Sequence, residues 1–393
     1  MDITCDNKGL TPEGDWIFKP NPNYDYQTGY EDVLDELHQF DCADFRERYT
    51  ELEKEKMVDK LFEIYRSINI FPIKYYSQKG MEDEVVKTIK KCDYLQKDGK
   101  YLANKYIEGN HLCRYLFPAI HGVGYFQEPA KSMFNRFYKD KWLRQGIKLT
   151  LNMNKTGGPG GLYNAFTLAG HTTTNFKPVS AKALYEYFTP PGGLIHDSSC
   201  GFGGRLMGAL TSYNNYQYIG TDPNTAIQKP LHKLGDLIND IQGRKDTYKI
   251  FCLGSEKFRF KGTEEIADFS FTSPPYFNLE LYSDEATQSY NEYNNIKTWV
   301  KYFLAPTIYN TYRILKPGAY YALNITDFAN DGKGGKQFKY VDTAIQLAEA
   351  VGFTYLYKID MRLTMRTGSG QRTRNDNSHG AGKMEGIYVF QKR

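Results

Sequence analysis

The chain has 393 residues, enough for two domains that each bury a core. Its net charge of +4 and sequence pI near 8.4 are mildly basic, which is compatible with a polyanionic partner and excludes a histone-like composition. The six cysteines lack the spacing of a zinc site or a disulfide framework, and the sequence shows neither a signal segment nor an apolar run of membrane-spanning length. We therefore expect no metal, no redox cofactor, no membrane association and a cytoplasmic location, in a prokaryotic cell or a virus-infected host cell.

The first part of the chain predicts a mainly helical region. Residues 1–30 are irregular, residues 44–69 carry apolar side chains at helical spacing, and residues 82–91 begin another helix. Further on, rings alternate with basic groups in a cluster made of Arg136, Phe137, Tyr138, Lys139, Lys141, Trp142 and Arg144. This cluster is either a nucleic-acid surface or a helix face over a core, and the second interpretation is favoured because basic residues between aromatic ones are common on helices.

A glycine-rich stretch over residues 154–161 predicts a flexible junction between two domains. We place a mainly helical N-terminal region at residues 1–153, with DNA recognition as a candidate role, and a catalytic domain at residues 162–393. A short helix over residues 181–188 precedes the first strand of that domain.

A strand, a loop and a helix follow one another over residues 193–212. Residues 193–196 predict a buried strand, residues 197–204 a glycine-rich turn, and residues 205–212 a helix. Gly201 and Gly203 allow a ligand to approach the backbone at the carboxyl end of a parallel strand. The next strand, residues 216–220, is followed by Asp222, whose carboxylate is spaced to accept the ribose hydroxyls of an adenosine cofactor.

Two further strands end in polar turns. Residues 248–253 lead to Gly254, Ser255 and Glu256, and residues 267–271 lead to Thr272 and then to the sequence Ser273, Pro274, Pro275, Tyr276 and Phe277. Two prolines remove two backbone donors and end the strand abruptly. The Ser273 hydroxyl and the Pro274 carbonyl are acceptors for the hydrogens of a nucleobase amine, and Tyr276 is a platform on which a base pulled out of a duplex stacks.

The remaining chain continues the alternation of helices and strands. We predict a helix over residues 298–315, stopped by Lys316, Pro317 and Gly318, a strand over residues 319–325, a helix over residues 341–351, and strands over residues 354–360 and 386–391. This pattern predicts an α/β fold with a mostly parallel sheet of seven strands, helices on both faces and the final pair as its antiparallel edge.

Residues 272–277 resemble the Ser-Pro-Pro-Tyr motif of the S-adenosylmethionine-dependent DNA amino-methyltransferases, and the predicted elements resemble their Rossmann-like fold. Members that modify cytosine usually carry Ser at the first position and members that modify adenine carry Asp or Asn, so Ser273 implies cytosine. The family's first motif aligns with residues 197–203, where Asp197, Gly201 and Gly203 match while its usual Pro and Phe are replaced.

The resemblance implies a site for S-adenosylmethionine. A segment upstream of the glycine loop packs against the methionine end of that cofactor in the family, which indicates Phe176 and Lys177. Where the family often has an Asp for the adenine amine, this chain has Ser255, with Glu256 as the neighbouring alternative. The implied cofactor-binding residues are Phe176, Lys177, Asp197, Cys200, Gly201, Phe202, Gly203, Asp222, Pro223, Ser255 and Thr272.

Two loops are candidates for holding the substrate. The loop at residues 278–295 contains Tyr282, Tyr290 and Tyr293 and can close over a base or a cofactor. The loop at residues 364–383 is either disordered or a DNA-facing arm, and carries Arg366, Arg372 and Arg374. With Phe277 and Tyr282, these arginines are the candidate substrate-binding residues.

The sequence therefore predicts a DNA methyltransferase that acts on the N4 amine of a cytosine flipped from double-stranded DNA, with the N6 amine of adenine as the alternative. RNA amines, protein glutamine and a non-catalytic nucleic-acid-binding module on the same fold remain open. A restriction endonuclease is a candidate partner, and the recognition sequence and oligomeric state are not determined by the sequence.

Overall fold

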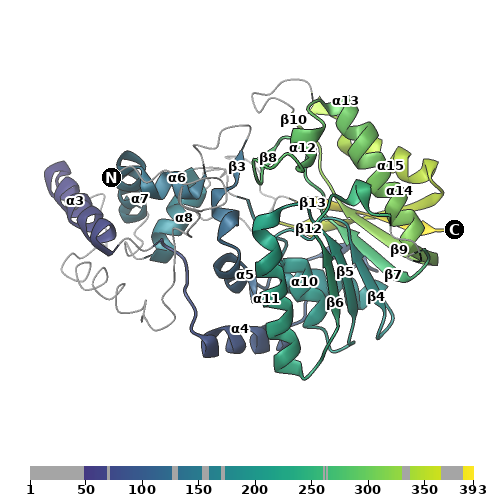
Figure 1. Ribbon diagram of the computed structural model, residues 1–393. Helices are drawn as coiled ribbons and strands as arrows, with labels where there is room; N and C mark the ends of the chain where they lie inside the picture. Colours follow the sequence, from purple (N-terminus) through teal and green to yellow (C-terminus); the bar gives the residue numbers. More distant parts are fainter. Residues whose placement is uncertain are drawn as a thin grey trace. The chain divides into compact units, whose positions relative to one another are not determined.

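A nine-stranded sheet is the largest sheet of the structure and the centre of its α/β part (Figure 1). In order across the sheet, the strands are β1 (Leu95–Gln96), β2 (Tyr101–Leu102), β12 (Phe353–Arg362), β13 (Met384–Lys392), β9 (Leu315–Asn324), β7 (Ala267–Thr272), β4 (Leu194–Asp197), β5 (Gln217–Thr221) and β6 (Tyr248–Phe251). The computed structural model describes residues 48–68, 71–125, 132–152, 159–169, 173–259, 262, 264–329, 337–363 and 384–393. Strands β6, β5, β4, β7 and β9 are parallel neighbours, which confirms the predicted α/β fold with a mostly parallel, Rossmann-like sheet.

Two details of the sheet differ from the prediction. The antiparallel strand is β13, and it lies between β9 and β12 instead of at the edge. Its residues Ile387, Val389 and Phe390 are fully buried, as expected for a strand with neighbours on both sides. Beyond β12, the short hairpin β1–β2 extends the sheet, with β2 parallel to β12.

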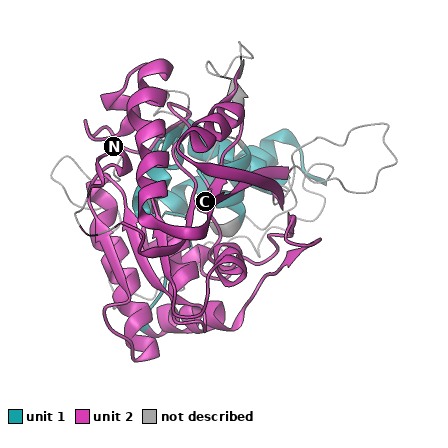
Figure 2. Cartoon of the chain, turned by 90° about the vertical axis from the view of Figure 1, so that its right-hand side faces the viewer, with its two compact units in different colours: residues 1–78, 118–173, 366–373 teal, residues 79–117, 174–365, 374–393 magenta. Residues whose placement is uncertain are grey.

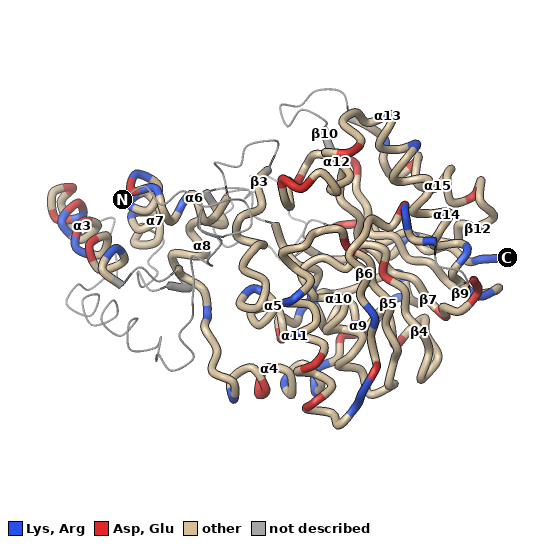
Figure 3. Tube along the Cα trace, viewed as in Figure 1, with Lys and Arg blue, Asp and Glu red and all other residues tan. Residues whose placement is uncertain are grey.

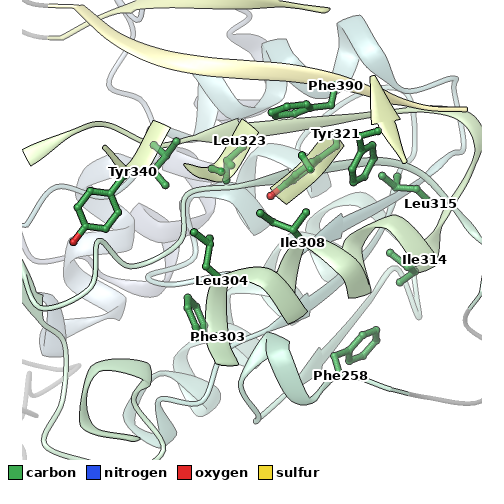
Figure 4. Close-up of a cluster of buried hydrophobic side chains, with 14 of the residues drawn as sticks. Phe258, Phe303, Leu304, Ile308, Ile314, Leu315, Tyr321, Leu323, Tyr340 and Phe390 are labelled. Atoms are coloured by element: carbon green, nitrogen blue, oxygen red, sulfur yellow. The ribbon is translucent and has the colours of Figure 1, made fainter. Parts of the chain in front are cut away.

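Helices cover both faces of the sheet (Figure 1). One group consists of α9 (Pro178–Phe188), α10 (Gly204–Leu210) and α11 (Thr225–Gln242), and the other of α14 (Ala305–Ile314) and α15 (Tyr340–Ala350). Figure 4 shows the core under the second group, where Ile308 and Leu304 face Tyr321, Leu323 and Phe390 of the sheet. This burial of apolar side chains on a helix stripe and a sheet face stabilises the layered architecture.

Two predicted elements differ in extent from those observed, and one helix was not predicted. The sequence did not indicate α11, an amphipathic helix of 18 residues that contains Pro230. The helix predicted over residues 298–315 is α13 (Ile296–Trp299), a π-helical turn (Val300–Leu304) and α14. Strand β9 begins at Leu315, before Pro317, so this proline stands inside the strand; the exposed positions of residues 316–318 show that it lies at the strand's solvent-facing start, where proline is tolerated.

The described chain divides into two compact units (Figure 2). The sheet unit holds residues 79–117, 174–363 and 384–393, and includes α4 (Gln78–Lys90), α5 (Asn110–Leu116), the single turn at Ser255–Lys257, β8 (Glu280–Leu281), α12 (Ser289–Glu292), β10 (Phe328–Ala329) and β11 (Gln337–Phe338). The second unit holds residues 48–78 and 118–169, with α3 (Glu51–Ile68), the turn at Pro118–Gly122, β3 (Gly124–Tyr125), α6 (Met133–Tyr138), α7 (Asp140–Asn152) and α8 (Pro159–Ala169).

The predicted junction is helical in its last part. Residues 154–158 lie outside the described residues, but residues 159–161 begin α8. Proline at the first position of a helix has the required φ and lacks only an N–H that would have no partner there. Gly160 and Gly161, the last glycines of the predicted junction, therefore lie in the first turn of a helix.

The aromatic and basic cluster of residues 136–144 lies largely on a helix face over a core. Arg136, Phe137 and Tyr138 are buried. Figure 3 shows Lys and Arg interspersed with Asp and Glu along α3. Arg144 of α7 bonds Asp59 of α3, and Arg66 of α3 bonds Asp140 of α7 at 2.8 Å. These contacts favour the structural interpretation over a nucleic-acid surface.

None of the helices that the structure describes combines the length and the apolar composition needed to span a bilayer.

Candidate functional site

The predicted loops meet at one edge of the sheet. Strand β4 pairs in parallel with β5 on one side and with β7 on the other, with His196 opposite Ile219 and Ser270. The loops that follow these three strands therefore leave the sheet side by side, and they carry Gly201, Asp222 and Ser273. The carboxyl ends of parallel strands, where the strand order reverses at β4, are the usual ligand site of open α/β sheets.

Asp197 organises the start of the glycine loop. It is fully buried, and its Oδ2 accepts hydrogen bonds from Arg205 Nε and Tyr218 Oη, both at 2.7 Å, while Oδ1 accepts from Ser199 N at 3.1 Å. Arg205 also donates to the Ser199 carbonyl. A buried carboxylate needs such compensation. Asp197 thus holds the loop's shape through its own protein partners, and no sequence pattern indicated Arg205 or Tyr218.

The loop's glycines meet different surroundings. Gly201 has φ +54°, and among the residues that the structure describes a Cβ there would find only the Ser199 carbonyl, at 3.8 Å. Gly203 has φ +77°, and a Cβ there would lie 2.6 Å from the Phe117 ring and 2.8 Å from Leu234. Open space therefore lies beside Gly201, as a ligand approaching the backbone requires, while Gly203 is needed for packing.

The other predicted residues of this loop act through their backbones. Cys200 is buried and its N–H donates to the Thr221 carbonyl at 3.0 Å. Phe202 is also buried, and its carbonyl accepts from Asn175 Nδ2 at 3.0 Å. These contacts tie the loop to β5 and to the segment before α9.

Asp222 reaches back to the glycine loop. Its Oδ2 accepts from Gly201 N at 2.9 Å and its Oδ1 accepts from Asn224 N at 3.0 Å. Burial raises the pKa of this carboxyl to about 6, although both hydrogen bonds favour the ionised form. Each carboxylate oxygen keeps a further lone pair, so Asp222 can accept two more donors beside Gly201. Pro223 follows it, with its carbonyl 3.5 Å from Thr287 Oγ1.

Phe176 and Lys177 lie in different surroundings. The Phe176 carbonyl packs so closely on α10 that a Cβ at Gly204 would be 2.0 Å away, and its ring meets Phe271 edge-on with the centroids 4.8 Å apart. Lys177 Nζ instead donates to the Asn104 carbonyl at 2.7 Å, and burial lowers its pKa. The structure therefore brings Phe176 to the glycine loop and turns Lys177 towards the end of β2.

The turn after β6 carries the two candidates for adenine contact, Ser255 and Glu256, and the structure gives them different surroundings. The Ser255 hydroxyl is buried and lies 2.8 Å from Thr307 Oγ1 of α14. Glu256 folds back over Gly254, where a Cβ would lie 2.4 Å from its Oε2. Burial raises the pKa of Glu256, and among the described residues its Oε2 has no hydrogen-bond partner.

The Ser-Pro-Pro-Tyr turn leaves β7 directly. Thr272 ends the strand fully buried, and Ser273, Pro274 and Pro275 continue without regular structure. Tyr276 Oη donates to Glu385 Oε1 at 2.9 Å and lies 3.4 Å from the Asn324 carbonyl.

Phe277 completes the turn in an unusual conformation. It has φ +47°, which a bulky side chain rarely adopts, and its buried ring contacts Trp299. Such strain persists only when packing enforces it, and it is concentrated at functional sites.

The loop after this turn runs past the cofactor side of the site. The Tyr282 ring lies 6.1 Å from Phe202, and its hydroxyl bonds Glu280. Farther on, Glu285 accepts from Thr225 N at 3.1 Å, at the start of α11. Residues 282–287 thus extend from the glycine loop to the end of β5. The sequence analysis had left undecided whether this loop covers a base or a cofactor, and these contacts place it beside the glycine loop and Asp222.

Several buried polar atoms at this edge have no protein partner. Within the described part of the chain these include Ser198 Oγ after β4, Glu256 Oε2 after β6, Thr272 Oγ1 at the end of β7 and Asn278 Oδ1 after the Ser-Pro-Pro-Tyr turn. Buried polar atoms without partners are rare, and a bound polar ligand satisfies them. Together with the open space at Gly201, they fit a polar cofactor such as S-adenosylmethionine. Arg366, Arg372 and Arg374 lie outside the described residues.

Comparison with known proteins gives fold likeness only. No family model and no curated protein matches this sequence. Similar solved structures include the cyclase SpnF (13% identity, 54% of this chain and 80% of that chain, TM-score 0.35) and geranyl diphosphate methyltransferase in complex with GPP and sinefungin (15%, 60% and 85%, 0.36). Another is TrmN from Thermus thermophilus (16%, 55% and 49%, 0.33), of which this chain spans about half. The substrate must therefore be argued from the site.

Proposed function

We propose that this protein transfers a methyl group from S-adenosylmethionine to the exocyclic N4 amine of a cytosine flipped out of DNA. The observation that supports this proposal is the juxtaposition of three loops on adjacent strands: the open backbone at Gly201, the carboxylate of Asp222 bonded to it, and the Ser-Pro-Pro-Tyr turn after β7. Ser273 favours cytosine over adenine N6, which is the second candidate base.

In this proposal the glycine loop and Asp222 hold the cofactor. Asp222 accepts the two ribose hydroxyls with the lone pairs that Gly201 and Asn224 leave, and Gly201 allows close approach. Glu256 Oε2, buried without a partner in the described structure, accepts the adenine amine in place of Ser255, whose hydroxyl is directed to Thr307. When bound, S-adenosylmethionine supplies an electrophilic methyl group on a sulfonium.

The catalytic turn prepares the acceptor amine. The lone pair of such an amine is delocalised into the ring, which makes it a poor nucleophile. Acceptors at the Ser273 hydroxyl and the Pro274 carbonyl engage its two hydrogens, so the nitrogen regains a directed lone pair. Stacking on Tyr276 offsets about 1–3 kcal/mol of the cost of flipping the base.

The test is to incubate the purified protein with S-adenosylmethionine and unmodified genomic DNA, digest the DNA, and measure methylated nucleosides by mass spectrometry. We expect N4-methylcytosine from the wild type and none from Asp222→Ala or Ser273→Ala. N6-methyladenine instead would select the second base. Calorimetry with S-adenosylmethionine separates the alternatives: binding without DNA product directs the search to RNA and protein glutamine, and no binding would support a non-catalytic module.

A further inference from the structure

The tyrosine of the catalytic turn is held by a carboxylate from a distant strand. Tyr276 Oη lies 2.9 Å from Oε1 of Glu385, which is 109 residues further along the chain, in β13. The same hydroxyl lies 3.4 Å from the carbonyl of Asn324, the last residue of β9. Asn324 Nδ2 in turn donates to the Gly386 carbonyl at 3.1 Å, which fixes the backbone beside Glu385. The ends of β7, β9 and β13 thus converge on one phenol.

This hydrogen bond restrains the ring at its far end. Burial, with Glu385 adding to it, raises the pKa of Tyr276 well above the ordinary value, so the phenol remains the donor. A hydroxyl that donates to a carboxylate makes a bond about twice as strong as one between neutral groups. The ring is attached to the proline turn at Cα and to β13 at Oη, which fixes its long axis. Because a phenol prefers its O–H in the ring plane, the bond to Glu385 also restrains rotation about that axis.

We propose that Glu385 is a positioning residue for the substrate base: it sets the plane on which the base stacks, and its charge, acting through the Tyr276 phenol, favours the positive charge that the base acquires. This inference rests on the proposed function. As the nitrogen–methyl bond forms from the amine lone pair, the sulfur–methyl bond breaks with both electrons left on sulfur, and the amine then loses a proton to water. A ring with a more negative face is the better partner for a base that carries this transient charge.

Three variants distinguish the effect of the Tyr276–Glu385 hydrogen bond from the effect of the Glu385 charge. Glu385→Gln keeps an acceptor of the same shape, Glu385→Ala removes both, and Tyr276→Phe keeps the ring without its hydroxyl. In single-turnover methylation we expect Glu385→Ala to lower the rate constant about 10- to 100-fold and Glu385→Gln about 3- to 10-fold, with unchanged affinity for S-adenosylmethionine. Adding Glu385→Ala to Tyr276→Phe should cost no more than about twofold, because the shared bond is already lost. Glu349→Ala, an exposed carboxylate on α15, is the matched control.

A second measurement does not depend on methyl transfer. The fluorescence of 2-aminopurine deoxyriboside is quenched on stacking, and we expect wild type with S-adenosylhomocysteine to quench it and Glu385→Ala to do so at least about fivefold more weakly. If wild type quenches but transfers no methyl group, the proposed function fails while the loss in Glu385→Ala still supports the positioning role. Equal quenching by wild type and Glu385→Ala, no quenching by wild type, or additive rate losses in the double variant would overturn the inference.

Discussion

Asp222 couples the candidate cofactor site to pH. Burial raises the pKa of its carboxyl to about 6, so this side chain loses its charge in mildly acidic solution. Only the ionised form offers all its lone pairs to ribose hydroxyls.

We predict that S-adenosylmethionine binds wild type about tenfold more weakly at pH 5 than at pH 7, since protonation of Asp222 competes with binding. Asp222→Asn should bind weakly at both pH values with little change between them. Calorimetric titration at the two pH values measures this difference, and an equally steep dependence in the variant would rule out Asp222 as its origin.

The two positive-φ glycines of the loop after β4 allow a paired substitution. A methyl group at Gly203 would collide with Phe117, whereas one at Gly201 would enter open space beside Asp222. We predict that Gly203→Ala destabilises the fold by about 2–4 kcal/mol, through overpacking and strain at positive φ.

Gly201→Ala should cost only about 1–2 kcal/mol, from φ alone, but weaken S-adenosylmethionine binding at least about tenfold. Denaturant unfolding and calorimetry on both variants check the pair. Normal cofactor affinity in a folded Gly201→Ala protein would contradict the close approach of the cofactor to the backbone at this position.

Among the helices and loops, the segment that follows the Ser-Pro-Pro-Tyr turn is attached to the start of α11. Glu285 accepts from Thr225 N, and a carboxylate at a helix N-terminus is stabilised by the helix dipole. Since this contact lies next to Asp222, we infer that the loop limits the escape of a bound cofactor.

We predict that Glu285→Ala raises the dissociation rate of S-adenosylmethionine about two- to fivefold, the worth of one such contact. Asp284→Ala removes the neighbouring exposed carboxylate and serves as the control. Stopped-flow release of the cofactor distinguishes them, and equal effects of the two substitutions would assign the change to net charge.

For the stability of the folded protein, His196 and Asp222 act in opposite directions as pH falls. Burial lowers the pKa of His196, on β4, from its ordinary 6.5 to about 4, so the unfolded chain takes up the proton first and stability falls as pH drops from 6.5 to 4. The raised pKa of Asp222 means that the folded chain takes up that proton first, so its contribution to stability rises as pH drops from about 6 towards 3.8.

We therefore predict that Asp222→Asn loses stability more steeply than wild type between pH 6.5 and 4.5, because the opposing contribution is gone. His196→Gln should show the reverse change of slope. Urea unfolding across this range measures the slopes, and curves of the two variants that run parallel to that of wild type would refute the coupling to these residues.

Local sequence patterns account for the alternation of strands and helices and for the order of the polar turns after them. Apolar runs that end in Gly201, Asp222 or Ser273 reflect local chemistry, since glycine, a carboxylate and paired prolines each limit what the chain can do next. These patterns were enough to predict the fold class and to predict which loops meet at one edge of the sheet. It missed α11, because Pro230 within an otherwise amphipathic pattern disguises a helix.

The partners of these residues, in contrast, follow from the packing of distant segments. Glu385 reaches Tyr276 across 109 residues, Asp197 is enclosed by Arg205 and Tyr218, and Lys177 turns away from the loop that Phe176 joins. The place of β13 between β9 and β12 was likewise beyond the sequence. The physical reason is that strand pairing and side-chain contacts between distant segments depend on how whole faces pack, which no local pattern encodes.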